Sequence, residues 1–152
     1  MNIKEIIKRY DPPQENLIPI LHEIQDENEF NYLTDEALEE VAEEMGRTYS
    51  EIHGTVTFYS MFSRKPRGRH IIRVCESAPC HIMGATTIID ALKVILGVEV
   101  GETTKCKDFT LEVTECLGIC AVAPAMMIDN VMYGNLTVEK LQEILDKVRK
   151  EG

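Results

Sequence analysis

The sequence lacks the motifs that would assign it to a common class of enzyme. It has no glycine-rich phosphate loop of the G-x-G-x-x-G or P-loop type, so any nucleotide that takes part must be bound by another chain. It has no C-x-x-C motif, which excludes a thioredoxin-type dithiol. The most apolar long window, residues 82–100, contains Asp90, Lys93 and Glu99 and is too polar to span a bilayer. We therefore expect no direct membrane insertion.

Basic side chains are scarce. The chain has 16 Lys and Arg against 26 Asp and Glu, a net charge of −10, so it repels phosphate backbones and is not expected to bind nucleic acid. The one basic stretch, residues 64–69, is interpreted either as a solvated linker or as a contact for an acidic partner. Neighbouring carboxylates such as Glu39 and Glu40 fall on a solvated helix face. We therefore predict no catalytic residue in this chain.

Residues 1–69 are predicted to form a helical bundle followed by a linker. Apolar residues recur at helical spacing in four stretches, 3–9, 16–26, 34–46 and 50–62. We expect Ser50 to cap the fourth helix, and Phe58, Tyr59 and Phe62 to lie in the core. Residues 35–62 have the outline of a helix-turn-helix, but the second helix lacks the side chains that read bases.

From His70 onward the pattern changes to short strands alternating with helices. Strands are predicted over residues 70–75, 98–100, 109–115, 125–128 and 131–133. Helices are predicted over residues 83–96 and from Thr137 to the end of the chain. This order predicts a thioredoxin-like α/β domain over residues 70–152, with a mostly antiparallel sheet, and an α+β class for the whole chain.

Four of the five cysteines form two close pairs. Cys75 and Cys80 have C-x4-C spacing, Cys116 and Cys120 have C-x3-C spacing, and each pair lies where a predicted strand ends. The charged N-terminus is unlike a signal peptide, so we expect a cytoplasmic protein, in which clustered thiols indicate metal or redox chemistry. Four thiolates, two for each iron, are the number that one [2Fe–2S] cluster needs.

Other roles for these cysteines fit the pattern less well. Structural zinc usually uses C-x2-C knuckles or added histidines, so a zinc-stapled, redox-silent scaffold is the alternative of another class. Disulfides conflict with a cytoplasmic location, and two turn-flanked pairs are not expected of plain buried thiols. Cys106 has no partner at loop spacing and is predicted to be a free thiol. His81 is expected near the ligands or at the surface rather than among them.

The motifs resemble those of a known family. The spacing of the cysteines is combined with residues 115–120 (ECLGIC) and with Ala123-Pro124. Residues 57–62 (TFYSMF) and 101–104 (GETT) supply further landmarks. Together they resemble the 24 kDa-subunit family of NADH:quinone oxidoreductase (complex I), which includes the small subunits of NAD-linked and electron-bifurcating hydrogenases and of NAD-dependent formate dehydrogenases.

The resemblance implies a role in electron transfer. It implies an N-terminal helical bundle, a thioredoxin-like domain, and one [2Fe–2S] cluster that exchanges single electrons with the FMN of an NAD(H)-binding flavoprotein subunit. It also implies a larger iron–sulfur or hydrogenase catalytic subunit in the same complex, and it makes this chain a non-catalytic redox subunit. A soluble, NAD-linked hydrogenase is the preferred parent complex, followed by complex I and formate dehydrogenase. The ligands that the resemblance implies are Cys75, Cys80, Cys116 and Cys120.

Overall fold

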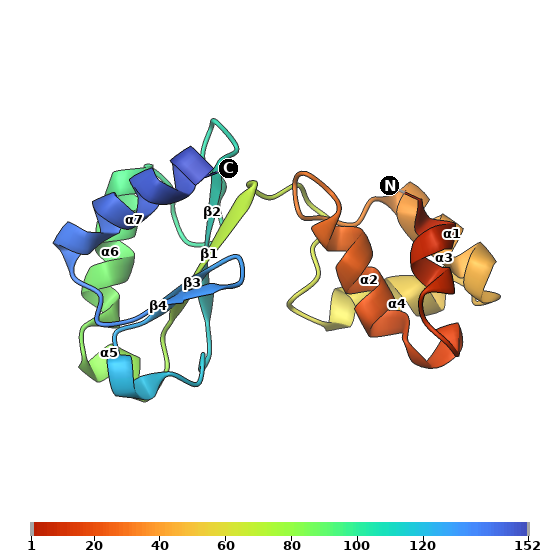
Figure 1. The fold of residues 1–152 in the computed structure, drawn as a ribbon, viewed down its shortest axis with the longest axis horizontal. Coiled ribbons are helices and arrows are strands. Elements are labelled where there is room, and N and C mark those ends of the chain that lie inside the picture. The colour runs from red at the N-terminus through yellow and green to blue at the C-terminus, as the bar shows by residue number, and fades with distance from the viewer. Residues whose placement is uncertain (1, 152) are drawn as a thin grey trace. The chain divides into compact units, whose positions relative to one another are not determined.

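The computed structural model describes residues 2–151 and divides the chain into two compact units, Met1–Arg67 and Gly68–Gly152 (Figure 1). The first unit is helical, and the second combines helices with a four-stranded sheet. The α+β class and the thioredoxin-like C-terminal architecture are as predicted. None of the helices within residues 2–151 has the length and apolarity that a membrane crossing requires.

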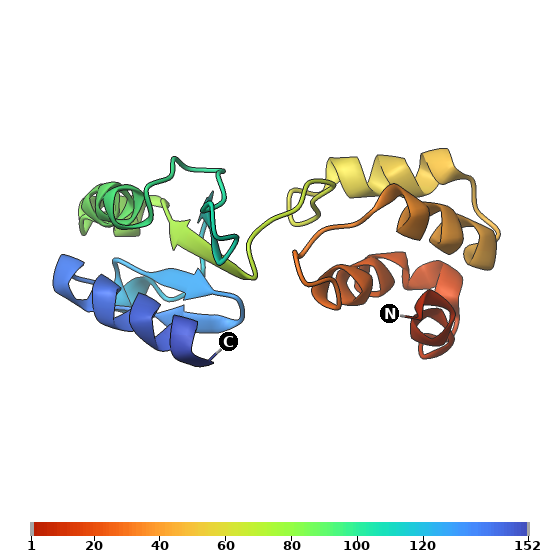
Figure 2. The same cartoon turned by 90° about the horizontal axis from the view of Figure 1, so that it is seen from above.

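The N-terminal unit is a bundle of four short helices (Figure 2). They are α1 (Ile3–Lys8), α2 (Leu17–Asp26), α3 (Asp35–Met45) and α4 (Tyr49–Phe58), with a 3-10 turn η1 (Pro13–Glu15) between α1 and α2. Their apolar faces meet in one core, in which Ile20, Leu38 and Ile52 have no exposed surface. The helical spacing of the apolar residues therefore predicted α1, α2 and α3 and the faces that they bury, whereas α4 departs from the prediction at both ends.

The start of α4 differs from the prediction. Its N-cap is Thr48, because the Thr48 hydroxyl accepts from the amide of Glu51 and the Glu51 carboxylate accepts from the amide of Thr48 at 2.9 Å. This reciprocal capping box satisfies two amide donors that a helix leaves free at its N-terminus. Ser50 lies inside the helix and is not the cap.

The end of α4 also differs, and two of the predicted core aromatics, Phe58 and Tyr59, are exposed. The helix ends at Phe58, since Tyr59 has an extended backbone, and of the three predicted core aromatics only Phe62 is buried. Phe58 is 79% exposed. It stands about 200° around the helix from the buried Val56, at 3.6 residues per turn, and therefore points away from the core.

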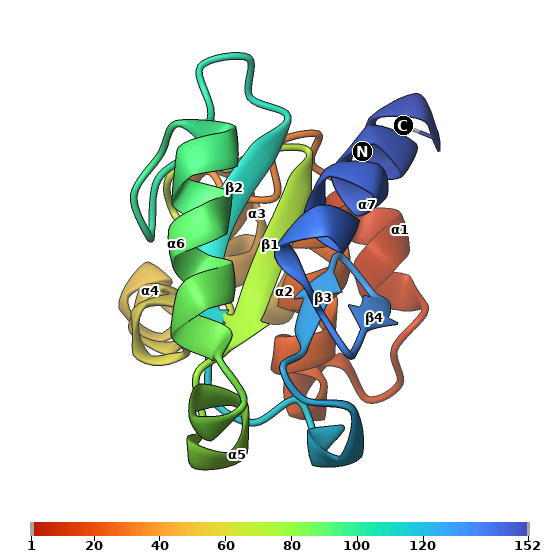
Figure 3. The same cartoon turned by 90° about the vertical axis from the view of Figure 1, so that its left-hand side faces the viewer.

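The C-terminal unit places two helices on one face of a mixed sheet (Figure 3). Its strands, in the order β2-β1-β3-β4, are β2 (Phe109–Thr114), β1 (His70–Cys75), β3 (Met126–Ile128) and β4 (Val131–Tyr133). Its helices are α5 (Ala78–Ile82), α6 (Ala85–Leu96) and α7 (Val138–Glu151), with a 3-10 turn η2 (Cys120–Val122). Helices α6 and α7 cover the sheet. Two of the three strand pairings are antiparallel, as predicted, but the longest ladder is parallel.

The parallel ladder determines where the cysteine loops lie. Strands β1 and β2 pair in register from His70 with Phe109 to Cys75 with Thr114. Parallel strands end at the same edge of a sheet, so the segments that follow Cys75 and Thr114 leave side by side.

Two local predictions in this unit were wrong. Residues 98–100 form no strand: Val98 and Glu99 are irregular and Val100 lies in a turn. The helix predicted over residues 83–96 is α6, which begins at Ala85, and it is preceded by α5, a separate helix that Gly84 divides from it by a left-handed backbone with φ 98°. Helix α5 thus lies within and just after the first cysteine loop, where no helix was predicted.

The basic stretch 64–69 is not a wholly solvated linker. Arg67 is buried and its Nε donates to the carbonyl of Asn31 at 2.8 Å. The amide of Gly68 donates to the hydroxyl of Thr110 at 2.6 Å. Arg64 forms an ion pair with Asp35 at 2.6 Å, so much of the stretch is held in place by specific contacts.

Candidate metal centre

Both cysteine loops leave the same edge of the sheet (Figure 3). Cys75 is the last residue of β1, and Cys116 follows the end of β2 by two residues. The amide of Glu76 donates to the carbonyl of Thr114 at 3.0 Å, which continues the ladder into the two loops. The amide of Cys75 donates to the carbonyl of Ala125 at 3.1 Å and fixes the strand end from its other side.

The two loops share one small apolar cluster. Cys75 and Cys80 are each 1% exposed, whereas Cys116 and Cys120 are exposed at the surface. The buried cysteines pack with three alanines, and Leu117 from the second loop packs against them. These alanines are Ala85, Ala123 and Ala125. The first pair is therefore shielded from water, and the second pair faces it.

The second loop brings its two sulfurs together. The Sγ atoms of Cys116 and Cys120 are 3.8 Å apart, and all five cysteines of the chain are free thiols. The amide of Gly118 donates to Cys116 Sγ at 3.3 Å. Gly118 has φ 80°, a backbone conformation that glycine adopts without strain, and this turn aims its amide at the sulfur. Donors of this kind stabilise a thiolate and adjust the reduction potential of a bound cluster.

The pKa values of the thiols reflect this environment. Burial opposes ionisation of Cys75, but hydrogen bonds from the amides of Leu117 and Ser77 hold its pKa below the ordinary value. Burial and the hydrogen bond with Cys75 raise the pKa of Cys80. The hydrogen bond and the charge of Cys116 raise the pKa of Cys120. Each perturbation involves another member of the set or the other loop, so the loops form one electrostatic unit.

The donor set fits a two-iron cluster. It consists of four soft thiol ligands in two pairs, with backbone amides directed at the sulfurs and an apolar shield on one side. Within residues 2–151, no three His, Cys, Asp or Glu side chains are arranged around a point where one ion would be held.

Cys106 and His81 lie outside these two pairs. Cys106 precedes β2, whereas Cys116 follows it, and a strand of six residues is roughly 20 Å long. The Cys106 thiol donates to the hydroxyl of Thr104 at 3.3 Å. The exposed His81 is within hydrogen-bond distance of Thr86 through Nδ1, at 3.3 Å.

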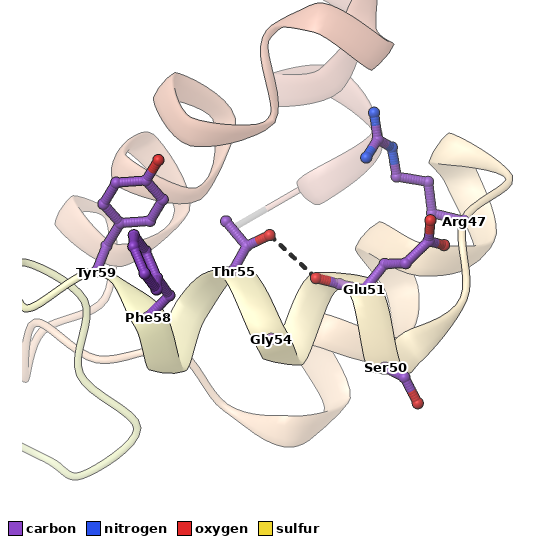
Figure 4. Close-up of a pocket in the computed structure, with 7 residues that line it drawn as sticks. All are labelled: Arg47, Ser50, Glu51, Gly54, Thr55, Phe58 and Tyr59. Atoms are coloured by element: carbon purple, nitrogen blue, oxygen red, sulfur yellow. Dashed lines mark hydrogen bonds between the residues drawn. The ribbon is translucent and has the colours of Figure 1, made fainter.

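Two cavities elsewhere contain no thiol. One, of about 450 Å³, lies along α4, and its lining includes Arg47, Gly54 and Phe58 (Figure 4). The other, of about 300 Å³, is lined by Arg69, Asp108 and neighbouring side chains of the C-terminal unit.

Sequence reasoning missed α5 and the contribution of Ala125. A signal for α5 was present, since Pro79 lies in its first turn, where proline is favoured, and Ser77 precedes the helix. The contact of Ala125 with Cys75 arises from pairing of β3 with β1, which no local pattern reveals.

Comparison with known proteins agrees with this geometry. The model of the family described as thioredoxin-like [2Fe–2S] ferredoxin matches residues 3–149. An NADH-quinone oxidoreductase subunit of Rickettsia bellii (strain RML369-C) is 37% identical over 150 residues, which are 97% of this chain and 89% of the relative. The corresponding subunit of Mycobacterium bovis (strain ATCC BAA-935 / AF2122/97) is 36% identical over 151 residues, 99% of this chain but only 59% of the relative. The chain thus spans about three fifths of the length of this mycobacterial relative.

A solved structure shows the same fold. The air-oxidized NAD+-reducing [NiFe]-hydrogenase superposes with a TM-score of 0.78 at 22% identity, covering 90% of this chain and 23% of that chain. The predicted resemblance to the small subunits of NADH:quinone oxidoreductase is confirmed, and the cofactor of the matching family is a [2Fe–2S] cluster. The match over nearly the whole chain shows that it belongs to the thioredoxin-like [2Fe–2S] ferredoxin family.

Proposed function

We propose that this chain is an electron-transfer subunit whose Cys75, Cys80, Cys116 and Cys120 hold one [2Fe–2S] cluster. The observation that carries the proposal is the meeting of both cysteine loops at the shared end of β1 and β2. Family membership supplies the cofactor, and the four thiols of these loops are the donors that it requires.

The residues of this chain would hold the cluster and tune it. The buried pair would shield one side from water, and the amide of Gly118 would stabilise thiolate charge on Cys116. When bound, the cluster supplies one-electron transfer at a potential that these hydrogen bonds and its burial adjust. The chain itself would bind no substrate.

The proposed electron partner is an FMN- and NAD(H)-binding flavoprotein subunit in a complex with a larger iron–sulfur or hydrogenase catalytic subunit. The names of the relatives, which are NADH-quinone oxidoreductase subunits and an NAD+-reducing hydrogenase, support such an assembly. The relatives by sequence are complex I subunits, whereas the hydrogenase likeness is one of fold. The proposal therefore covers both parent complexes, a bifurcating hydrogenase included, with formate dehydrogenase as a further candidate.

The cluster end of the C-terminal unit has the chemistry of a contact surface for such a partner. Ile82 is 81% exposed and Met83 is 61% exposed, and both closely follow Cys80. Exposed Glu76 and Glu115 lie in the two cysteine loops, and residues 74–92 and 113–139 contain no Lys or Arg. An apolar centre with an acidic rim fits a partner surface with an apolar centre and a basic rim.

Metal analysis tests the proposal. Anaerobically purified protein should contain iron and acid-labile sulfide in equal amounts, two of each per chain in a [2Fe–2S] cluster, and should give an EPR signal after reduction with dithionite. Zinc without sulfide or signal would contradict electron transfer and favour the redox-silent scaffold. The proteins that co-purify then identify the parent complex: a membrane arm, a nickel–iron or H-cluster subunit, or a molybdenum or tungsten subunit.

A further inference from the structure

The turn that carries Cys120 has little support of its own. Turn η2 is a single 3-10 turn, closed by hydrogen bonds from the amide of Val122 to the carbonyl of Ile119 at 3.0 Å and from the amide of Ala123 to the carbonyl of Cys120 at 3.3 Å. Its first residue, Cys120, is exposed. The position of this thiol therefore depends on whatever holds the end of η2.

The segment that follows β4 holds the end of η2. The amide of Asn135 donates to the carbonyl of Val122 at 2.5 Å, and the amide of Leu136 donates to the carbonyl of Pro124 at 3.1 Å. This segment continues from the β3–β4 hairpin, which is paired with β1 in the sheet. The sheet thus holds the turn through two hydrogen bonds.

Gly134 allows the two segments to approach each other. A Cβ atom at this position would lie 2.3 Å from Cγ2, 2.6 Å from Cβ and 2.9 Å from the carbonyl oxygen of Val122. Carbon atoms in favourable contact are about 3.5–4.0 Å apart, so Val122 occupies the space that a side chain would need. The backbone of Gly134 is not left-handed, so the requirement is for space rather than for an unusual conformation.

We propose that Gly134 is a positioning residue for Cys120. Because Gly134 has no side chain, the segment that contains Val122 can approach its backbone, and this close approach sets the position of the Cys120 thiol relative to Cys116. The inference rests on the proposed function for its consequence, because a displaced Cys120 would alter a bound cluster. Its geometric part concerns only the thiols of this chain.

The test is Gly134→Ala in the full-length protein, with two kinds of measurement. In the iron-loaded protein, a misplaced ligand is expected to speed cluster loss to a chelator roughly tenfold, the effect typical of losing a residue that orients a ligand, and to shift the EPR spectrum. In the apoprotein, the Cys116–Cys120 disulfide should be half-formed at a different ratio of reduced to oxidised glutathione. Mass spectrometry after alkylation measures the fraction of disulfide at each ratio. The glutathione ratio at which a Cys75–Cys80 disulfide forms serves as an internal reference and should stay the same.

Two further variants separate positioning from general destabilisation. Val122→Gly removes both side-chain atoms that the new methyl group would meet, so adding it to Gly134→Ala should restore both readouts toward wild type. Gly54→Ala adds the same methyl group where no atom lies within 4 Å and should change neither readout.

Each outcome decides the proposal. Unchanged cluster loss together with an unchanged Cys116–Cys120 ratio in Gly134→Ala would overturn it, as would equal changes at both cysteine pairs. If the wild-type protein bound no iron but the Cys116–Cys120 ratio alone shifted, the positioning role would stand and the proposed electron transfer would fall.

Discussion

Gly68→Ala is predicted to destabilise the C-terminal unit although it adds only one methyl group. A Cβ atom at Gly68 would lie 2.6 Å from the carbonyl carbon of Phe109 and 2.9 Å from its Cα and N. All three are backbone atoms at the start of β2, and none can rotate away. The amide of Gly68 also donates to the Thr110 hydroxyl at 2.6 Å, so a shift that relieves the clash would break this buried hydrogen bond.

The size of the effect follows from these contacts. Overpacking of this kind costs about 1–3 kcal/mol. Loss of the hydrogen bond to Thr110 adds about 1 kcal/mol. The expected loss of unfolding free energy is thus about 2–4 kcal/mol, and each 2 kcal/mol lowers the Tm of a domain of this size by roughly 8–16 °C.

Hydrogen exchange measured by mass spectrometry reads this loss within one unit of the chain. Peptides from β1 and β2 should exchange faster in Gly68→Ala, while peptides from α1–α4 should keep wild-type rates. Gly54→Ala is the matched control: it lies in an open helix position and should stabilise α4 by about 0.5–1 kcal/mol. Wild-type protection of β1 and β2 in Gly68→Ala would refute the reasoning, because it would mean that β2 accommodates the methyl group freely.

Three other substitutions test separate parts of the account. The buried Gln25 amide donates to the carbonyl of Met61 and accepts from the amide of Ser63. Gln25→Leu removes both hydrogen bonds, so the unfolding free energy of the N-terminal unit, measured in urea, should fall by about 1–3 kcal/mol. An unchanged urea midpoint would contradict this role. Ile82→Lys should slow electron exchange with the flavoprotein partner, whereas Val94→Lys, at an equally exposed position on α6, should not, and equal effects would place docking elsewhere. A hydrogen bond from Arg64 holds the pKa of Asp35 below its ordinary value. The ionised Asp35 carboxylate therefore stabilises the folded N-terminal unit at neutral pH, and this contribution is lost as the pH falls through the lowered pKa. An NMR titration should show the Asp35 pKa rising in Arg64→Ala.

Local signals predicted the elements whose bounds are marked by their own residues. Thr34 and Gly46 mark the two ends of α3, and both act as caps in the structure. The β-branched run at residues 70–75 coincides with β1. The cysteine spacings, together with the strands before them, predicted that each pair follows the end of a strand, and both loops leave the same edge of the sheet.

The features that were missed depend on competition between signals or on tertiary contacts. Thr48 and Ser50 are both N-cap residues by type, and only the reciprocal bond with Glu51 selects Thr48. Phe58 is apolar yet exposed, because it lies on the face of α4 that points away from the core. Gly134 approaches Val122 closely although the two residues belong to different segments, and neither segment contains a local sequence pattern that predicts this contact.

The central claim is that Cys75, Cys80, Cys116 and Cys120 together hold one [2Fe–2S] cluster. It is tested most directly by EPR and visible absorption spectra of the single Cys→Ser variants, loaded and reduced under identical anaerobic conditions. Each of these four substitutions should abolish or strongly distort the wild-type spectrum, and Cys106→Ser should leave it unchanged. A wild-type spectrum from Cys116→Ser, or its loss in Cys106→Ser, would contradict the claim.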